Sequence, residues 1–156
     1  MWKYESCDWE NIALHDNVID RICLNGNDIL LVFDDGFDVV KTHHLNDTGK
    51  SKHTTASQII LKNGVLKKGI VFRDVGKDKQ RQEEKIDLSW LMNFPLGIDV
   101  ARFKVENNVL ILDSYKITYD NKVDFLTIEI SSSDVLFCWD DYSSDAWFEG
   151  WPKNIR

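Results

Sequence analysis

The segment VIDRICLNGNDILLVFDDGFDVVK, residues 18–41, decides the fold class. It holds three short runs rich in Val, Ile, Leu and Phe, and these are separated by Asn25-Gly26-Asn27 and by Asp34-Asp35-Gly36. Asn and Gly accept the positive φ angles of tight hairpin turns, so the pattern predicts consecutive antiparallel strands. The middle run, Ile29–Phe33, is apolar on both faces, and we expect it to lie centrally in its sheet.

The same rhythm continues along the rest of the chain. Asn63-Gly64 is a second clear hairpin signal, and Thr127–Ile130 alternates between polar and apolar residues as a half-buried strand does. We expect strands over residues 18–24, 28–33, 37–41, 55–62, 65–74, 100–105, 109–117, 123–130 and 135–139. The chain is therefore predicted to be all-β, mainly an antiparallel sandwich or flattened barrel of about nine or ten strands, in a single domain over residues 1–156.

Helix is expected to be scarce, with one to three short pieces. The candidates are residues 8–14 with Asp8 as cap, residues 89–94 ending before Pro95, and residues 142–150 ending at Gly150. Residues 76–85, GKDKQRQEEK, contain no apolar side chain and are expected to form a mobile charged loop.

Composition excludes several classes of protein. Lys and Arg number 19 against 26 Asp and Glu, which gives a net charge of −7 and argues against a general nucleic-acid binder. The three cysteines are odd in number and form no C-x-x-C pair, as in proteins of a reducing compartment. No apolar run is long enough for a membrane span or a secretory signal, so we expect a cytoplasmic protein with no membrane partner.

Motifs for catalysis, cofactors or metals are not evident. His43, His44 and His53 could in principle ligate a metal, but neighbouring residues on a strand point to opposite faces, so we expect no metal site. Gly49-Lys50-Ser51 lacks the earlier glycine of a phosphate-binding loop. The paired carboxylates Asp34-Asp35 and Asp140-Asp141 are typical of turns. The sequence therefore predicts no catalytic residues and no cofactor.

The densest functional signal lies near the C-terminus. Residues 123–152 contain seven acidic and seven aromatic side chains and no Lys or Arg. One interpretation makes Phe137, Trp139 and Phe148 core residues with the acids on the rim; the other exposes Tyr142, Trp147 and Trp151 among carboxylates. Because exposed Trp and Tyr anchor protein interfaces and clustered acids select a basic partner, the second predicts a protein-binding surface. Its residues are Asp140, Asp141, Tyr142, Asp145, Trp147 and Glu149.

The segments Leu14–Ile19, Trp139–Tyr142 and Ala146–Glu149 resemble those of small uncharacterised bacterial all-β domains. Some of these domains are immunity proteins of contact-dependent or polymorphic toxin systems. The resemblance implies a cytoplasmic partner of a toxin, for which a nuclease with a basic substrate groove is one candidate. Two alternatives remain: a small-ligand-binding β-barrel protein or enzyme, and a homodimer joined through edge strands.

Overall fold

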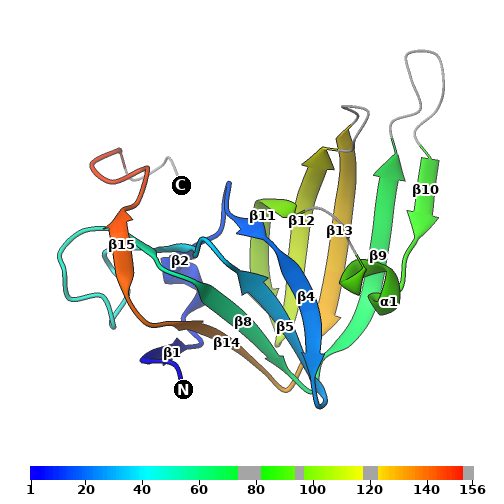
Figure 1. Ribbon diagram of the computed structural model, residues 1–156, viewed down its shortest axis with the longest axis horizontal. Coiled ribbons are helices and arrows are strands. Elements are labelled where there is room, and N and C mark those ends of the chain that lie inside the picture. The colour runs from blue at the N-terminus through cyan, green and yellow to red at the C-terminus, as the bar shows by residue number, and fades with distance from the viewer. Residues whose placement is uncertain (74–81, 94–96, 118–122, 153–156) are drawn as a thin grey trace.

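The computed structural model describes residues 1–73, 82–93, 97–117 and 123–152, and in these ranges the chain is built of antiparallel strands (Figure 1). A five-stranded sheet has the order β1-β14-β8-β5-β4. Its strands are β1 (Tyr4–Ser6), β14 (Asp134–Trp139), β8 (Ser57–Lys62), β5 (Asp28–Phe33) and β4 (Arg21–Asn25).

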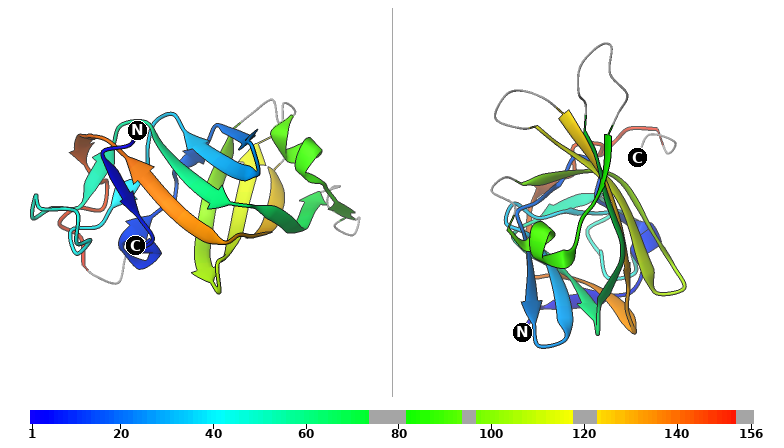
Figure 2. Two further views of the ribbon diagram at one scale, coloured as in Figure 1. Left: turned by 90° about the horizontal axis from the view of Figure 1, so that it is seen from below. Right: turned by 90° about the vertical axis from the view of Figure 1, so that its right-hand side faces the viewer.

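A six-stranded sheet has the order β10-β9-β13-β12-β11-β3. Its strands are β10 (Gln82–Lys85), β9 (Val65–Arg73), β13 (Val123–Ser131), β12 (Val109–Ile117), β11 (Ile98–Glu106) and β3 (Val18–Ile19). The β4–β5 and β11–β12 hairpin turns and the β8–β9 connection lie at the same end of the molecule (Figures 1 and 2). The predicted hairpin at Asn63-Gly64 is wrong, because β8 and β9 belong to different sheets and the turn joins those sheets. Several of these turns need positive φ, as at Gly26, Asn63 and Asn107.

A third, four-stranded sheet has the order β15-β7-β6-β2. Its strands are β15 (Tyr142–Asp145), β7 (Lys52–Thr54), β6 (Asp38–Val39) and β2 (Ile12–Ala13). Three of them continue strands of the five-stranded sheet across short breaks: β5 leads to β6, β7 leads to β8, and β14 leads to β15. The small sheet therefore extends the larger one beyond the sandwich (Figure 1).

The core lies between the two large sheets because alternate residues of each strand point inward. Strand β5 shows this directly, with Ile29, Leu31 and Phe33 at most 1% exposed and the residues between them half-buried. Phe137 on β14 is fully buried and makes edge contacts with Phe37, with ring centroids 6.2 Å apart. The antiparallel sandwich is thus confirmed, whereas the flattened barrel is not, since the sheets in the described ranges stay open.

Several details of the prediction need correction. The described ranges hold fifteen strands, more than the nine or ten expected. One predicted run, residues 18–24, divides into β3 and β4, and five short strands lie outside every predicted run: β1, β2, β7, β10 and β15. Strand β5 lies inside its sheet, but β8 is the central strand. The expected charged loop at residues 76–85 is wrong in its last part, since Gln82–Lys85 pairs with β9; residues 76–81 fall outside the described ranges.

The helices are short, as predicted, but only two of the three candidates form. A 3-10 helix, η1, covers Trp9–Asn11, and an α-helix, α1, covers Leu88–Met92 with the Asp87 carboxylate accepting a hydrogen bond from Trp90 N. The predicted helix at residues 142–150 is wrong: Tyr142–Asp145 forms β15, and a turn follows. No helix in the described ranges is long and apolar enough to cross a membrane.

Candidate functional site

The C-terminal arm, residues 140–152, is held against β7 by its own acidic side chains. The Asp145 carboxylate pairs with Lys52 at 2.7 Å and with Lys50 at 3.6 Å, and the hydrogen bond from Lys52 lowers the pKa of Asp145. The Glu149 carboxylate accepts a hydrogen bond from the backbone amide of Ser51. Two of the acids predicted to face a partner therefore anchor the arm to the fold.

The remaining predicted residues have different environments. Asp140 accepts a hydrogen bond from the backbone amide of Lys3 at 2.7 Å, and the backbone carbonyl of Asp141 accepts one from Thr55 N at 2.9 Å. Tyr142 is half-buried and stacks on Tyr4, and burial raises the pKa of its hydroxyl. The side chains of Asp140 and Tyr142 thus contact the N-terminal segment at Lys3 and Tyr4, whereas Asp141 is held through its backbone carbonyl.

Two tryptophans are the exposed part of this arm. Trp147 is 45% exposed and Trp151 is 52% exposed, and their rings meet edge to face with centroids 5.3 Å apart. Phe148 is buried, and Trp139 is fully buried. Both interpretations of the aromatic tail are therefore partly realised: Trp139 and Phe148 belong to the interior, while Trp147 and Trp151 reach the surface.

A groove of about 570 Å³ lies beside Trp147. Its walls come from η1, β2, the segment after β2, and β11; they include Trp9, Ile12, Leu14, His15, Arg102 and Phe103. The Trp9 and Phe103 rings meet edge to face at 5.9 Å, and Phe103 in turn contacts the buried Phe137 at 6.0 Å. One wall of the groove is therefore continuous with the rigid core.

His15 brings an oriented imidazole to this groove. Its Nδ1 lies 2.7 Å from the carbonyl oxygen of Ala101, to which it donates, and its ring lies 6.2 Å from that of Trp147. Ala101 is the extra residue of a β-bulge in β11, between Val100 and Arg102, and the bulge turns its carbonyl toward His15. The other ring nitrogen, Nε2, lies 3.4 Å from the Asp16 carboxylate. Sequence reasoning missed this groove because its walls are far apart in the chain.

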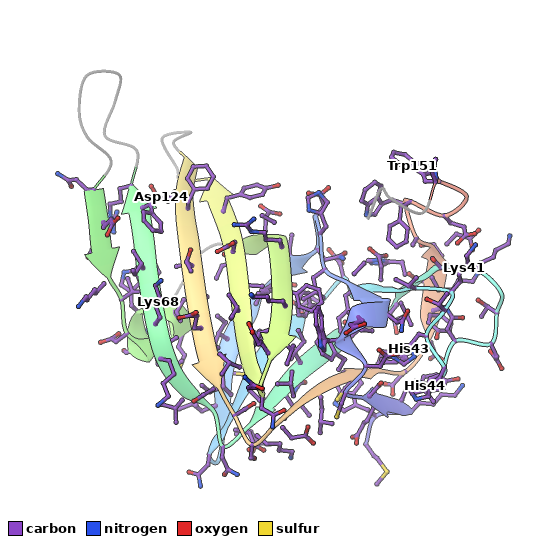
Figure 3. The ribbon with its side chains drawn as sticks, turned by 180° about the vertical axis from the view of Figure 1, so that it is seen from behind. Lys41, His43, His44, Lys68, Asp124 and Trp151 are labelled. Atoms are coloured by element: carbon purple, nitrogen blue, oxygen red, sulfur yellow. The ribbon has the colours of Figure 1, made fainter. Side chains whose placement is uncertain are left out.

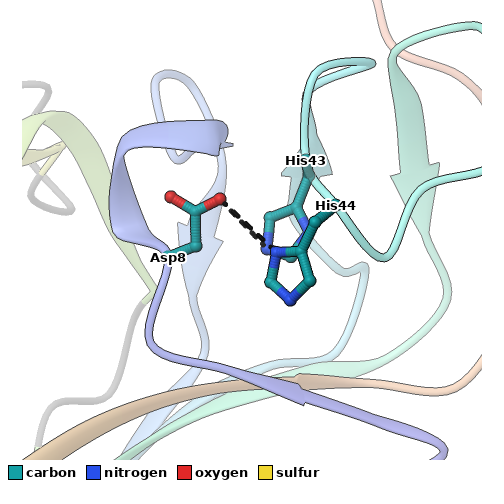
Figure 4. Close-up of side chains that lie close together, drawn as sticks. All are labelled: Asp8, His43 and His44. Atoms are coloured by element: carbon teal, nitrogen blue, oxygen red, sulfur yellow. Dashed lines mark ion pairs between the residues drawn. The ribbon is translucent and has the colours of Figure 1, made fainter.

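A second cluster brings Asp8, His43 and His44 together (Figure 4). His43 Nε2 lies 4.0 Å and His44 Nδ1 3.8 Å from the same oxygen, Oδ2 of Asp8, and the two imidazoles are stacked. The expectation that His43 and His44 point to opposite faces is therefore wrong, since they lie in a turn after β6 and not in a strand. Both lie on the same side of the molecule as Trp151, away from Lys68 on β9 (Figure 3).

His53 is separate from this cluster and has a structural partner. Its Nδ1 lies 2.7 Å from the carboxylate of Asp38, which is fully buried, and its Nε2 faces the carbonyl of Asp35. The hydrogen bond that His53 donates to the Asp38 carboxylate raises the pKa of His53, against an opposing effect of burial. Asp38 also accepts a hydrogen bond from Asn17 Nδ2 at 3.1 Å. This buried pair joins β6 to β7 beneath the C-terminal arm.

Comparison with known proteins returns no family model, no curated protein and no solved structure that matches this chain. The resemblance to immunity proteins therefore remains a prediction. The candidate site has to be argued from its own residues.

Proposed function

We propose that this chain is a protein-binding module whose contact surface centres on the groove between Trp9, Phe103 and Trp147. The observation that carries the proposal is the half-exposed Trp147, which stands at the edge of an aromatic groove of about 570 Å³. Trp is the residue most enriched among interface anchors, because it buries a large rigid area at low entropic cost. A partner side chain that enters the groove would cover Trp147 and Trp9 together.

The charge of the chain favours a basic partner. The net charge of −7 accelerates encounter with a cationic surface, and Glu10 is an acidic residue of the groove wall. The rings of Trp9 and Trp147 offer faces on which a Lys or Arg side chain can be held by cation–π attraction. A basic side chain of a protein partner therefore matches both the aromatic walls and the overall charge.

The predicted partner-binding residues divide into two roles under this proposal. Trp147 makes contact with the partner, whereas Asp145 and Glu149 hold the arm on which Trp147 stands. Asp140 and Asp141 form the link between β14 and β15, and Tyr142 begins β15. The acids thus act mainly by placing the tryptophans, and their long-range field remains available for steering.

The finer proposal is that the partner is a toxin and that this chain is its cytoplasmic immunity protein. It rests on the resemblance of the segments Leu14–Ile19 and Ala146–Glu149, and on the match between an acidic inhibitor and the basic substrate groove of a nuclease. Under this proposal the chain blocks the toxin by occupying the toxin's basic substrate groove. A large secreted protein encoded by a neighbouring gene would be the first partner to test.

The experiment compares captured proteins between three baits prepared from the full chain: wild type, Trp147→Ala and Leu24→Ala. Leu24 is a matched control, since it is 49% exposed and lies on β4, outside the groove. A partner captured from lysate of the native host should be retained by wild type and by Leu24→Ala. It should bind Trp147→Ala about 30-fold or more weakly than wild type, as expected for an interface anchor. Its affinity for wild type should also decrease as the salt concentration is raised.

Two results would contradict the proposal. One is a set of captured proteins that does not differ between wild type and Trp147→Ala. The other is a partner whose affinity is independent of salt, which would remove the argument from charge. Capture of a toxin encoded by a neighbouring gene would support the proposal of an immunity protein. Capture of an unrelated basic protein would support only the proposal of a protein-binding module.

A second candidate function is the binding of a small molecule in the same groove. Its volume of about 570 Å³ lies within the range of small-ligand pockets, and His15 is oriented there by Ala101 while Arg102 is oriented by Asp113. A metabolite retained through gel filtration and detected by native mass spectrometry would favour this candidate. Its loss from Trp147→Ala and retention by Leu24→Ala would place it in the groove.

A further inference from the structure

We propose that Asp8, His43 and His44 bind one divalent transition-metal ion of the Zn²⁺ class. The three residues come from two segments: Asp8 precedes η1, and the histidines follow β6. Each offers one donor atom, and all three atoms lie within 4.8 Å of one another. Imidazole and carboxylate donors together suit Zn²⁺ and its neighbours, whereas Ca²⁺ and Mg²⁺ prefer oxygen donors alone.

The spacing of the donors fits a single ion. Oδ2 of Asp8 is the common vertex, 4.0 Å from Nε2 of His43 and 3.8 Å from Nδ1 of His44. A point equidistant from the three atoms lies no more than about 2.5 Å from each, so a closure of at most a few tenths of an ångström reaches bonds of about 2.0–2.2 Å. Three protein ligands leave a fourth position to water, which can enter because the His44 side chain is 65% exposed.

A second observation points to a ligand independently of the spacing. The His43 side chain is fully buried, and its Nε2 makes no hydrogen bond within the described part of the chain. Buried polar atoms are nearly always paired, so an orphaned ring nitrogen directed at a carboxylate requires an explanation.

The surroundings support the cluster in the way that metal sites require. Asn11 Nδ2 donates to Oδ2 of Asp8 at 2.8 Å and orients the carboxylate. The buried Trp139 ring stands edge-on to His43, with centroids 5.3 Å apart, and fixes the position of that imidazole. Asp8 and His43 are therefore held in place, and the exposed His44 is the ligand that can move.

Coordination requires two local changes, and both are testable. The imidazoles are stacked with planes 17° apart, so His44 has to tilt for its lone pair to meet an ion in the plane of His43. Leu45 N donates to Nδ1 of His43 at 3.1 Å, which places the proton of the neutral ring on Nε2. Binding through Nε2 requires the neutral ring to carry its proton on Nδ1 instead, and this change of tautomer breaks the Leu45 hydrogen bond. We therefore expect the Leu45 amide resonance to shift when metal binds.

The test is titration of the full chain with Zn²⁺ alone. Calorimetry measures the binding, and thermal unfolding measures the melting temperature with and without Zn²⁺. Wild type should bind one equivalent and melt at a higher temperature with Zn²⁺, because an ion that binds only the native state stabilises it. His44→Ala and Asp8→Asn should each weaken binding by more than the roughly 10- to 100-fold that loss of a supporting residue costs. His44 is exposed, so His44→Ala tests the site without disturbing the core.

Asp47→Asn is the matched control, since Asp47 is an exposed acid three residues after His44 and outside the cluster. It should bind Zn²⁺ as wild type does. The proposal is overturned if wild type binds no stoichiometric Zn²⁺, or if His44→Ala and Asp8→Asn bind as tightly as Asp47→Asn. Trp147→Ala should leave Zn²⁺ binding intact, so this result is separable from the outcome for the groove.

Discussion

Replacement of Asp38 by Asn tests the buried pair that supports the C-terminal arm. The carboxylate accepts from His53 Nδ1 at 2.7 Å through one oxygen and from Asn17 Nδ2 at 3.1 Å through the other. An amide offers only one acceptor, so one of these two donors would face an NH₂ group. Asn17 cannot simply rotate, because its Nδ2 also donates to the carbonyl of Ala13.

The magnitude follows from the kind of hydrogen bond that is lost. A hydrogen bond to a charged group contributes about 1.5–3 kcal/mol, and an unsatisfied buried donor costs about 1–3 kcal/mol. Because the His53 side chain is 24% exposed, hydrogen bonds to water replace part of the lost interaction. We therefore expect Asp38→Asn to lower the free energy of unfolding by about 2–3 kcal/mol.

The pH dependence gives a sharper test. The pKa of His53 is raised in the folded state above its ordinary value of 6.5. The stability from the charged pair is therefore fully present below about pH 6.5 and is lost as the pH rises through the folded pKa. Burial lowers the pKa of His43, which has the opposite effect below pH 6.5, but His43 is common to both variants and cancels in their difference.

Urea denaturation of wild type and Asp38→Asn at pH 6.0 and pH 8.5 measures this difference. We expect the loss to be larger at pH 6.0, and Asp47→Asn, an exposed acid-to-amide control, to change stability little at either pH. A double-mutant cycle with His53→Gln isolates the pair. An equal loss at both pH values, or one under about 0.5 kcal/mol, would refute the assignment of a charged pair.

Three further predictions concern single side chains. Gly36→Ala should destabilise the fold by more than about 1 kcal/mol in urea denaturation, since Gly36 has φ of +85° and a Cβ would lie 2.3 Å from the carbonyl oxygen of Thr54. Phe137→Ala should cost about 3–5 kcal/mol by the same assay, because the ring is fully buried against Phe37. Burial raises the pKa of the Cys138 thiol to about 12, so iodoacetamide at pH 8 should leave Cys138 unmodified in the native protein and label it after unfolding, as peptide mass spectrometry would show.

The strands and their turns could be predicted from the sequence because their causes are local. Strands β5 and β12 have the predicted bounds, and Gly26 adopts the positive φ of the hairpin expected there. Asn63 also has positive φ, but the turn that it forms joins two different sheets and is not the expected hairpin. A turn depends on which backbone angles a few neighbouring residues accept, and a strand's buried face follows from its alternation. Both kinds of information are contained in short stretches of sequence.

The candidate site was predictable only in part. The acidic and aromatic neighbours of Trp147 left two interpretations open, of which one exposes this residue, and in the structure it is 45% exposed. The groove beside it needed Trp9, His15 and Phe103, which lie in other elements. The predicted helix at residues 142–150 fails for a related reason: β7 offers an unpaired edge, and Tyr142–Asp145 hydrogen-bonds to it as a strand.

What the sequence by itself determined is the class of the fold, most of its longer strands and the β4–β5 and β11–β12 hairpins. The tertiary structure alone decided which distant residues meet: Asp8 with His43 and His44, Asp38 with His53, and Trp9 with Phe103. The physical reason is the range of the forces. Backbone preferences and hydrophobic alternation act over a few residues, whereas pairing between strands and closure of the sandwich bring together segments that share no local signal.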